Sequence, residues 1–126
     1  MKSSGLIGLS IMVGIGIGAI VERTHAQPEP PVYYVSEIEV TNLDAYSREY
    51  APRIQANIKA FGGRILAAST KVATMEGDPP KPRVIIHVWD NIEQIQQWRD
   101  SAEFKEIRAI GHKSAKFRDF IVEGLP

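Results

Sequence analysis

His87 is the side chain of this sequence best suited to acid–base chemistry. It is the only ionisable residue in the apolar run 84–89, and an imidazole exchanges protons near neutral pH. Alternation along a strand places His87 on one face with Ile85 and Trp89, whose indole would line a binding site beside it. The alternative is a histidine packed and hydrogen-bonded in the sheet or at a subunit interface, because buried ionisable groups are not confined to functional sites.

Four more side chains are candidates for binding a substrate. Tyr33 and Tyr34 bring a phenol to each face of a predicted strand, so one is expected in the core and the other can donate a hydrogen bond into a cavity. Arg64 follows two glycines, and Glu76 precedes Gly77. Both positions have structural alternatives, since Arg64 can pair with an acidic neighbour and Gly77 permits a positive φ.

The sequence predicts neither a metal site nor a cofactor. It has no cysteine, which excludes disulfides, thiolate zinc sites and cysteine nucleophiles. The three histidines, His25, His87 and His112, lack the spacing of metal ligands. Glu37 and Glu39 lie two residues apart on one strand face, where they can divide acid and base roles or simply be solvated.

The elements that must position these side chains follow the order strand, helix, strand, strand, helix, strand. Their predicted ranges are Val32–Val40, 43–61, 65–75, 84–89, 92–113 and 117–122. β-branched and aromatic residues mark the strands, and apolar residues three and four apart mark the helices. This order predicts a ferredoxin-like βαββαβ α+β sandwich, in which helices cover one face of a four-stranded antiparallel sheet.

Several local signals set where these elements begin, bend and end. Thr41 or Asn42 is predicted to cap the first helix, and Pro52 to kink or restart it. Gly62-Gly63 ends that helix, and Ser69-Thr70 is a predicted bulge in a long second strand.

The second helical stretch has two start signals. Asp90 and Glu93 form a capping-box-like pair at its beginning, and Ser101 is a second cap within it. Trp98 lies on its apolar stripe and is expected in the core.

The first 26 residues are predicted to be a signal peptide. Lys2 precedes an uncharged apolar stretch, and Thr24 and Ala26 occupy the −3 and −1 positions of a cleavage site. Residues 27–31 then form a proline-rich linker before one domain, residues 32–126. The alternative is an uncleaved membrane anchor, so the domain is expected in the periplasm or secreted, or else anchored and facing outside the cytoplasm.

Composition limits the class of partner. The 126 residues have 15 Lys and Arg against 15 Asp and Glu, and a chain without net positive charge is not expected to bind nucleic acid. A membrane is a partner only if the leader is not cleaved.

An ordered set of short motifs is similar to one bacterial family. The set comprises Gly62-Gly63-Arg64, Glu76-Gly77, Asp100-Ser101-Ala102-Glu103-Phe104 and Val122-Glu123-Gly124. Together they resemble the domain-of-unknown-function 1330 family of the dimeric α/β-barrel superfamily. The resemblance implies a ferredoxin-like protomer whose sheet packs against a second copy, and it implies no particular reaction. Gly111 and Val88 depart from the family, which more often has an Arg and an acidic residue there.

Three functional hypotheses follow from the residues and the resemblance. The first is an enzyme, independent of a cofactor or only weakly dependent on one, that transforms a small apolar or aromatic molecule in a pocket on a sheet face, using His87 with Tyr33, Tyr34 or Trp89. The second is a binding or stress-associated domain with the same pocket. The third is a structural homodimer with no open pocket. The presence of a cavity beside His87 distinguishes the first two hypotheses from the third.

Overall fold

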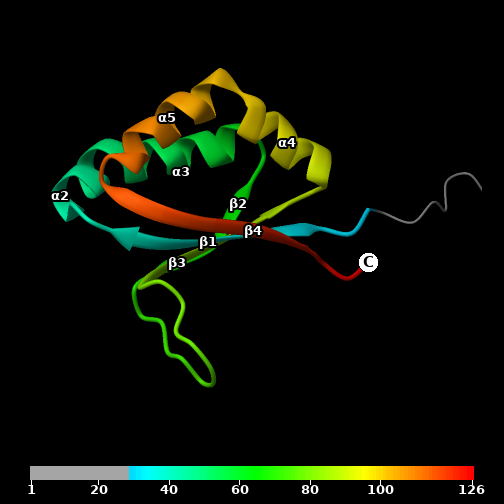
Figure 1. The fold of residues 1–126 in the computed structure, drawn as a ribbon. Helices are drawn as coiled ribbons and strands as arrows, with labels where there is room; N and C mark the ends of the chain where they lie inside the picture. The colour runs from blue at the N-terminus through cyan, green and yellow to red at the C-terminus, as the bar shows by residue number, and fades with distance from the viewer. Residues whose placement is uncertain (1–28) are drawn as a thin grey trace, which may run out of the picture.

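The computed structural model describes residues 29–126 and shows an α+β fold. The predicted leader, residues 1–26, and the first two linker residues lie outside this part. A four-stranded antiparallel sheet has helices on one side (Figure 1). The elements are β1 (Val32–Val40), α2 (Leu43–Ala45), η1 (Tyr46–Tyr50), α3 (Ala51–Ala60), β2 (Arg64–Ser69), β3 (Arg83–Trp89), α4 (Ile92–Asp100), α5 (Ala102–His112) and β4 (Ala115–Glu123). Within residues 29–126, no helix is long and apolar enough to cross a membrane.

The strand order β2-β3-β1-β4 confirms the predicted ferredoxin-like topology. β1 and β3 are the inner strands, and β1 pairs along its whole length with β4, from Val32 opposite Glu123 to Val40 opposite Ala115. Every pair of neighbouring strands is antiparallel. Helices connect β1 to β2 and β3 to β4 across one face of the sheet. The remaining described loop, residues 70–82, projects from the opposite side of the sheet (Figure 1).

The register brings side chains from three strands into rows on the face that the helices cover. One row contains Ile85, Ser36 and Asp119, and the next contains His87, Tyr34 and Ile121. The core fills the space between this face and the helices. Its buried apolar members include Val32, Tyr34, Ile38, Tyr46, Tyr50, Ile54, Ile58, Trp89, Ile95, Trp98, Phe104 and Ile107.

The first helical segment has the interruption that Pro52 predicts. Asn42 caps α2 by accepting a hydrogen bond from the Ala45 backbone N–H at 3.1 Å. The backbone then widens into the π-helical turn η1, and α3 begins at Ala51 with Pro52 in its first turn, where a missing N–H is tolerated. Gly62 ends the segment at φ 101°.

The second helical stretch consists of two helices that meet at Ser101. The Ser101 side chain caps α5 by accepting from the Phe104 N–H at 3.1 Å, as predicted. The predicted cap of α4 is wrong by one residue. Asn91 accepts from the Gln94 N–H, and the Gln94 side chain in turn accepts from the Asp90 N–H. The capping-box-like pair is therefore Asn91 with Gln94, not Asp90 with Glu93.

The second strand is shorter than predicted. β2 ends at Ser69 instead of near residue 75, and residues 70–82 have no regular secondary structure. The bulge lies between Ile65 and Ala67, not at Ser69-Thr70. Ser69 instead turns the chain, since its hydroxyl accepts from the Lys71 N–H at 2.9 Å, which removes this donor from strand pairing.

The sheet face opposite the helices is apolar in its central rows, with Arg64 at the β2 edge opposite Val88, and has no covering element among residues 29–126. Its rows contain Val88, Tyr33 and Val122, then Ile86, Val35 and Phe120. Glu37 lies at its other end, where it pairs with Arg118 and accepts from the Lys81 N–H. We call this surface the open face.

Candidate functional site

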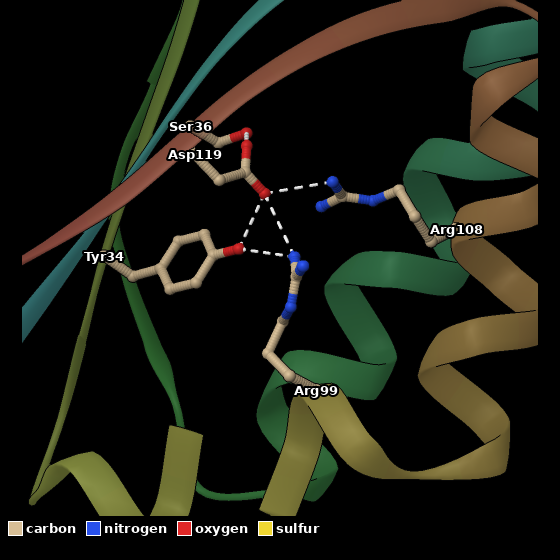
Figure 2. Close-up of polar contacts among 5 residues, drawn as sticks. All are labelled: Tyr34, Ser36, Arg99, Arg108 and Asp119. Atoms are coloured by element: carbon tan, nitrogen blue, oxygen red, sulfur yellow. Dashed lines mark hydrogen bonds and ion pairs between the residues drawn. The ribbon is translucent and has the colours of Figure 1, made fainter. Parts of the chain in front are cut away.

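A carboxylate on β4 whose side chain is only 12% exposed is the centre of the most polar part of the interior. Asp119 Oδ2 accepts from the Tyr34 hydroxyl at 2.6 Å and from Arg108 at 3.0 Å, and Arg99 lies 3.4 Å away. Its Oδ1 accepts from the Ser36 hydroxyl at 2.6 Å. We call these five residues the Asp119 cluster (Figure 2).

Each member of the Asp119 cluster is positioned by a different local feature. Tyr34 and Ser36 are two residues apart on β1, so both point to the helix-covered face, and the β1–β4 register places Asp119 opposite Ser36. Arg99 comes from α4 and Arg108 from α5, and both guanidinium groups point toward the carboxylate (Figure 2). The Ser101 turn between the two helices makes this convergence possible.

The two guanidinium groups also pack on aromatic rings. Phe104 lies 4.5 Å from the Arg99 guanidinium carbon and 5.0 Å from that of Arg108, measured to the ring centroid. Phe117 lies 4.0 Å from Arg108 on the same measure. These contacts hold the planar groups in place, and cation–π attraction adds to the ion pairs.

Electrostatics fix the protonation states in the Asp119 cluster. Burial acts to raise the pKa of Asp119, but the Arg108 charge and the hydrogen bonds from Ser36, Tyr34 and Arg108 outweigh it, so the pKa is lowered and the group is a carboxylate. Burial raises the pKa of the Tyr34 phenol, and the Asp119 charge raises it further. Tyr34 is therefore a neutral hydrogen-bond donor.

His87 lies beside the Asp119 cluster and is neutral. Its ring stacks on Tyr34 with 4.6 Å between centroids, and its Nδ1 accepts from Trp89 Nε1 at 2.7 Å. Burial lowers the pKa of His87 to about 4, with the charge of Arg108 acting in the same direction and that of Asp119 opposing it. Since Nδ1 is an acceptor, the hydrogen of the neutral ring is on Nε2.

A small cavity of about 20 Å³ lies between the sheet and the helices beside these groups. Tyr34, Ser36, His87 and Arg108 form its polar wall. The rest of the lining is apolar or aromatic: Ile38, Ile54, Ile58, Ile85, Tyr50 and Trp98. Trp98 is itself fixed by a 2.7 Å hydrogen bond from Nε1 to Asn57 Oδ1. A cavity of this size holds about one water molecule.

The structure brings three of the six predicted site residues together. His87, Tyr34 and Trp89 lie on the helix-covered face, in contact with one another through stacking and hydrogen bonding. The remaining three predicted residues are elsewhere. Tyr33 lies on the open face, packed against Gly124; Arg64 is exposed at the start of β2; and Glu76 is exposed in the loop 70–82.

Four residues of the site were not predicted from the sequence: Ser36, Arg99, Arg108 and Asp119. Asp119 carried a usable signal, because it alternates with Phe117 and Ile121 and so is a carboxylate on an otherwise apolar strand face. Arg99 and Arg108 carried none, since arginines in amphipathic helices are usually solvated.

The two departures from the expected family pattern lie on different surfaces. Gly111 is buried in α5, where an added Cβ would lie 2.6 Å from the Tyr50 ring, so a larger residue has no room beside that ring. Val88 lies on the open face, opposite Tyr33. Neither position contributes a side chain to the Asp119 cluster.

The fold and the site define a ferredoxin-like α/β protein with a polar centre between sheet and helices. Its solved structural neighbours include the RPA0582 protein of unknown function from Rhodopseudomonas palustris, with a TM-score of 0.64, 12% identity and coverage of 82% of this chain and 88% of that one. SnoaB, a cofactor-independent oxygenase from Streptomyces nogalater, has a TM-score of 0.52 and 12% identity, and the match covers 77% of this chain and 95% of SnoaB. HapK from Hahella chejuensis has a TM-score of 0.54 and 11% identity, and the match covers 75% of this chain and 92% of HapK. At these identities the likeness shows the fold alone.

Sequence comparison then identifies the family. Residues 31–125 match the family described as Domain of unknown function (DUF1330), and the chain belongs to it. Comparison with curated protein sequences finds no match. The predicted resemblance is therefore confirmed, and the family's description assigns no reaction.

Proposed function

We propose that the chain binds a small, largely apolar or aromatic molecule between its sheet and its helices. The observation that carries the proposal is the cavity beside His87, in which isoleucines face a neutral imidazole, a buried phenol and Arg108. Small-molecule sites typically combine apolar walls with a few convergent polar groups. Burying an apolar ring against the four isoleucines supplies affinity, and the polar wall orients the molecule.

His87 is the group of the cavity that donates a hydrogen bond to the bound molecule. Its Nδ1 is held by Trp89, so Nε2–H is the free donor of the ring. The neutral imidazole can therefore donate this hydrogen to an oxygen of the ligand. SnoaB, described as a cofactor-independent oxygenase, has a similar fold, which is compatible with chemistry carried by side chains alone.

Binding an aromatic ring requires the cavity to open, since its present volume is about 20 Å³. Arg99 is the exposed member of the Asp119 cluster, with a side-chain exposure of 42%, and Ile121, opposite Tyr34 on β4, has a residue exposure of 41%. Arg99 also makes the longest contact to Asp119. The site is therefore expected to open at Arg99, while Arg108 stays in place.

Thermal shift measurements with a panel of small aromatic compounds test this proposal. A ligand that binds only the folded chain raises the melting temperature, and the stabilisation is about 2.7 kcal/mol at a ligand concentration 100 times the dissociation constant. At least one compound is expected to stabilise the wild-type chain but not Ile85→Phe, which fills the cavity. Ile92→Phe, on α4 and outside the cavity, is the matched control. If no compound stabilises the wild type, or if Ile85→Phe responds equally, the proposal is wrong.

We also propose that the chain forms a homodimer through the open face. This face has six apolar or aromatic residues in its two central rows, and helices cover only the other side. A sheet with one uncovered apolar face gains free energy by burying it, and a second copy offers a surface of the same size. A standard interface would bury on the order of 800 Å² on each copy.

Export remains a proposal from the sequence. The pattern of residues 1–26 supports a signal peptide, with cleavage after Ala26. Cell fractionation followed by N-terminal sequencing tests it, and a mature N-terminus at Gln27 is the expected result. Recovery of the uncleaved chain from the cytoplasm would contradict it.

A further inference from the structure

The interior has more positive than negative side chains where the helices meet the sheet. Arg99 and Arg108 face a single carboxylate, Asp119. His87 adds no charge, because burial lowers its pKa to about 4, and the neighbouring phenols of Tyr34 and Tyr50 are protonated, since burial raises the pKa of each. The cluster therefore carries one positive charge that none of its own members balances.

The buried guanidinium nitrogens likewise include hydrogen-bond donors that have no acceptor among the described residues. Arg108 Nε has no hydrogen-bond partner among the described residues, and its side chain is only 12% exposed. Arg83, one row further along the sheet, also has a buried Nε without a partner there, and it lies over the Tyr46 ring instead of beside a carboxylate. Unsatisfied donors on buried charged groups are costly, so they mark a place where an acceptor is favoured.

Three other carboxylates, on α5 and on the sheet, pair with other side chains or lie away from the two arginines. Glu106 on α5 pairs with Arg53 on α3 at 3.5 Å. Glu37 pairs with Arg118 on the open face, on the other side of the sheet. Glu123 shares the helix-covered face with Asp119, but it lies at the far end of β4 beside Ile92 and Glu93. No acidic side chain of residues 29–126 besides Asp119 approaches the two arginines within ion-pair distance.

We propose that the ligand of this site is an organic anion, with its acidic group bound by Arg99 and Arg108 and its apolar part directed into the isoleucine-lined cavity. This inference rests on the proposed small-molecule function and adds the charge of the ligand. Arginine presents paired N–H donors that match a carboxylate, and two arginines and the Tyr34 hydroxyl converge here. Arg99 and Arg108 thus have a positioning and charge-neutralising role toward the ligand.

Isothermal titration of the full chain with a matched pair, benzoate and benzamide, tests the inference. The two compounds have nearly the same shape and differ in charge. Benzoate is expected to bind the wild type about tenfold more tightly, which is the effect of one hydrogen bond to a charged group. Its affinity is also expected to decrease with added salt.

The variant Arg99→Gln locates the effect. Arg99 is the half-exposed member of the pair, so its replacement is expected to leave the fold intact. The variant should lose the preference for benzoate and keep its affinity for benzamide. Arg53→Gln, which removes an exposed arginine from α3, should behave as the wild type.

Three outcomes contradict the inference in different ways. Equal binding of both compounds to the wild type would overturn the anion assignment and leave the small-molecule function intact. A preference for benzoate that persists in Arg99→Gln would place the anion elsewhere. Binding of neither compound, together with no stabilising compound in the thermal shift panel, would refute the proposed function and this inference with it, leaving a structural ion cluster.

Discussion

At the scale of single residues, the interior depends on hydrogen bonds between largely buried polar side chains. Asp119 satisfies both of its oxygens through Tyr34, Ser36 and Arg108. His87 satisfies one nitrogen through Trp89. Removing one side chain of such a hydrogen-bonded group leaves its partner buried and unpaired. The resulting loss of folding free energy is larger than the net contribution of the hydrogen bond itself.

The His87 imidazole makes stability depend on pH. Its pKa is about 4 in the folded chain against an ordinary 6.5, so the unfolded chain binds a proton first as the pH falls. The free energy of unfolding should therefore decrease between pH 6.5 and 4, by up to roughly 3 kcal/mol from this group. Urea unfolding across this range measures the loss.

The variant His87→Gln separates this effect from general acid sensitivity. Glutamine keeps an acceptor for Trp89 Nε1 but does not titrate. The variant should lose most of the decrease between pH 6.5 and 4, whereas His112→Gln, at the exposed end of α5, should retain it. An unchanged decrease in His87→Gln would contradict the assignment.

Asp119→Asn tests the Asp119 cluster as an electrostatic unit. The substitution keeps the shape and removes the charge that Arg99 and Arg108 share, so the free energy of unfolding should fall by about 2–4 kcal/mol. The same substitution at Asp44, whose pair with Arg48 is largely exposed, should cost less than about 0.5 kcal/mol. Equal effects of the two substitutions in chemical denaturation would show that Asp119 is not buried among arginines.

At the scale of elements, the contact between α5 and η1 depends on one glycine. Glycine within a helix is normally unfavourable, and replacement by alanine stabilises an exposed position by roughly 1 kcal/mol. At Gly111 the added Cβ would lie 2.6 Å from the Tyr50 ring and 3.1 Å from Phe117. Gly111→Ala is therefore expected to destabilise the fold by about 1–3 kcal/mol.

A double mutant identifies the ring as the cause. Tyr50→Leu in the Gly111→Ala background should recover part of the loss, so that the two substitutions are not additive in thermal or urea unfolding. Strict additivity, or stabilisation by Gly111→Ala alone, would mean that the helix does not approach Tyr50 this closely.

Patterns along single elements predicted most of the fold. Pro52 and Asn42 predicted the restart and the cap of the first helical segment, because proline and cap chemistry act within one turn. The second strand was predicted too long, since residues 70–75 have strand-forming side chains but no partner strand to pair with.

The site was only half predicted, because it depends on distances between elements. Alternation put His87 and Trp89 on one face, as the structure shows. The meeting of Asp119 with Tyr34 and Ser36 needs the β1–β4 register, and its meeting with Arg99 and Arg108 needs the angle between two helices. Neither quantity is encoded in any short motif.

At the scale of the whole molecule, the open face predicts the oligomeric state. Size-exclusion chromatography with light scattering should give twice the mass of one chain. Ile86→Lys puts a charge in the middle of the open face and should produce monomers, because a buried unpaired ammonium is costly. Ile92→Lys, on α4, should remain dimeric. A monomeric wild type, or a dimeric Ile86→Lys, would contradict the proposed interface.

Binding of a small molecule between the sheet and the helices is best tested by isoleucine-methyl and indole N–H NMR spectra of the chain, recorded during titration with benzoate. We expect saturable shifts at Ile54, Ile58 and Ile85 and at the Trp98 indole N–H, which line the cavity. Shifts absent from these signals, or confined to surface residues such as Ile92, would contradict it.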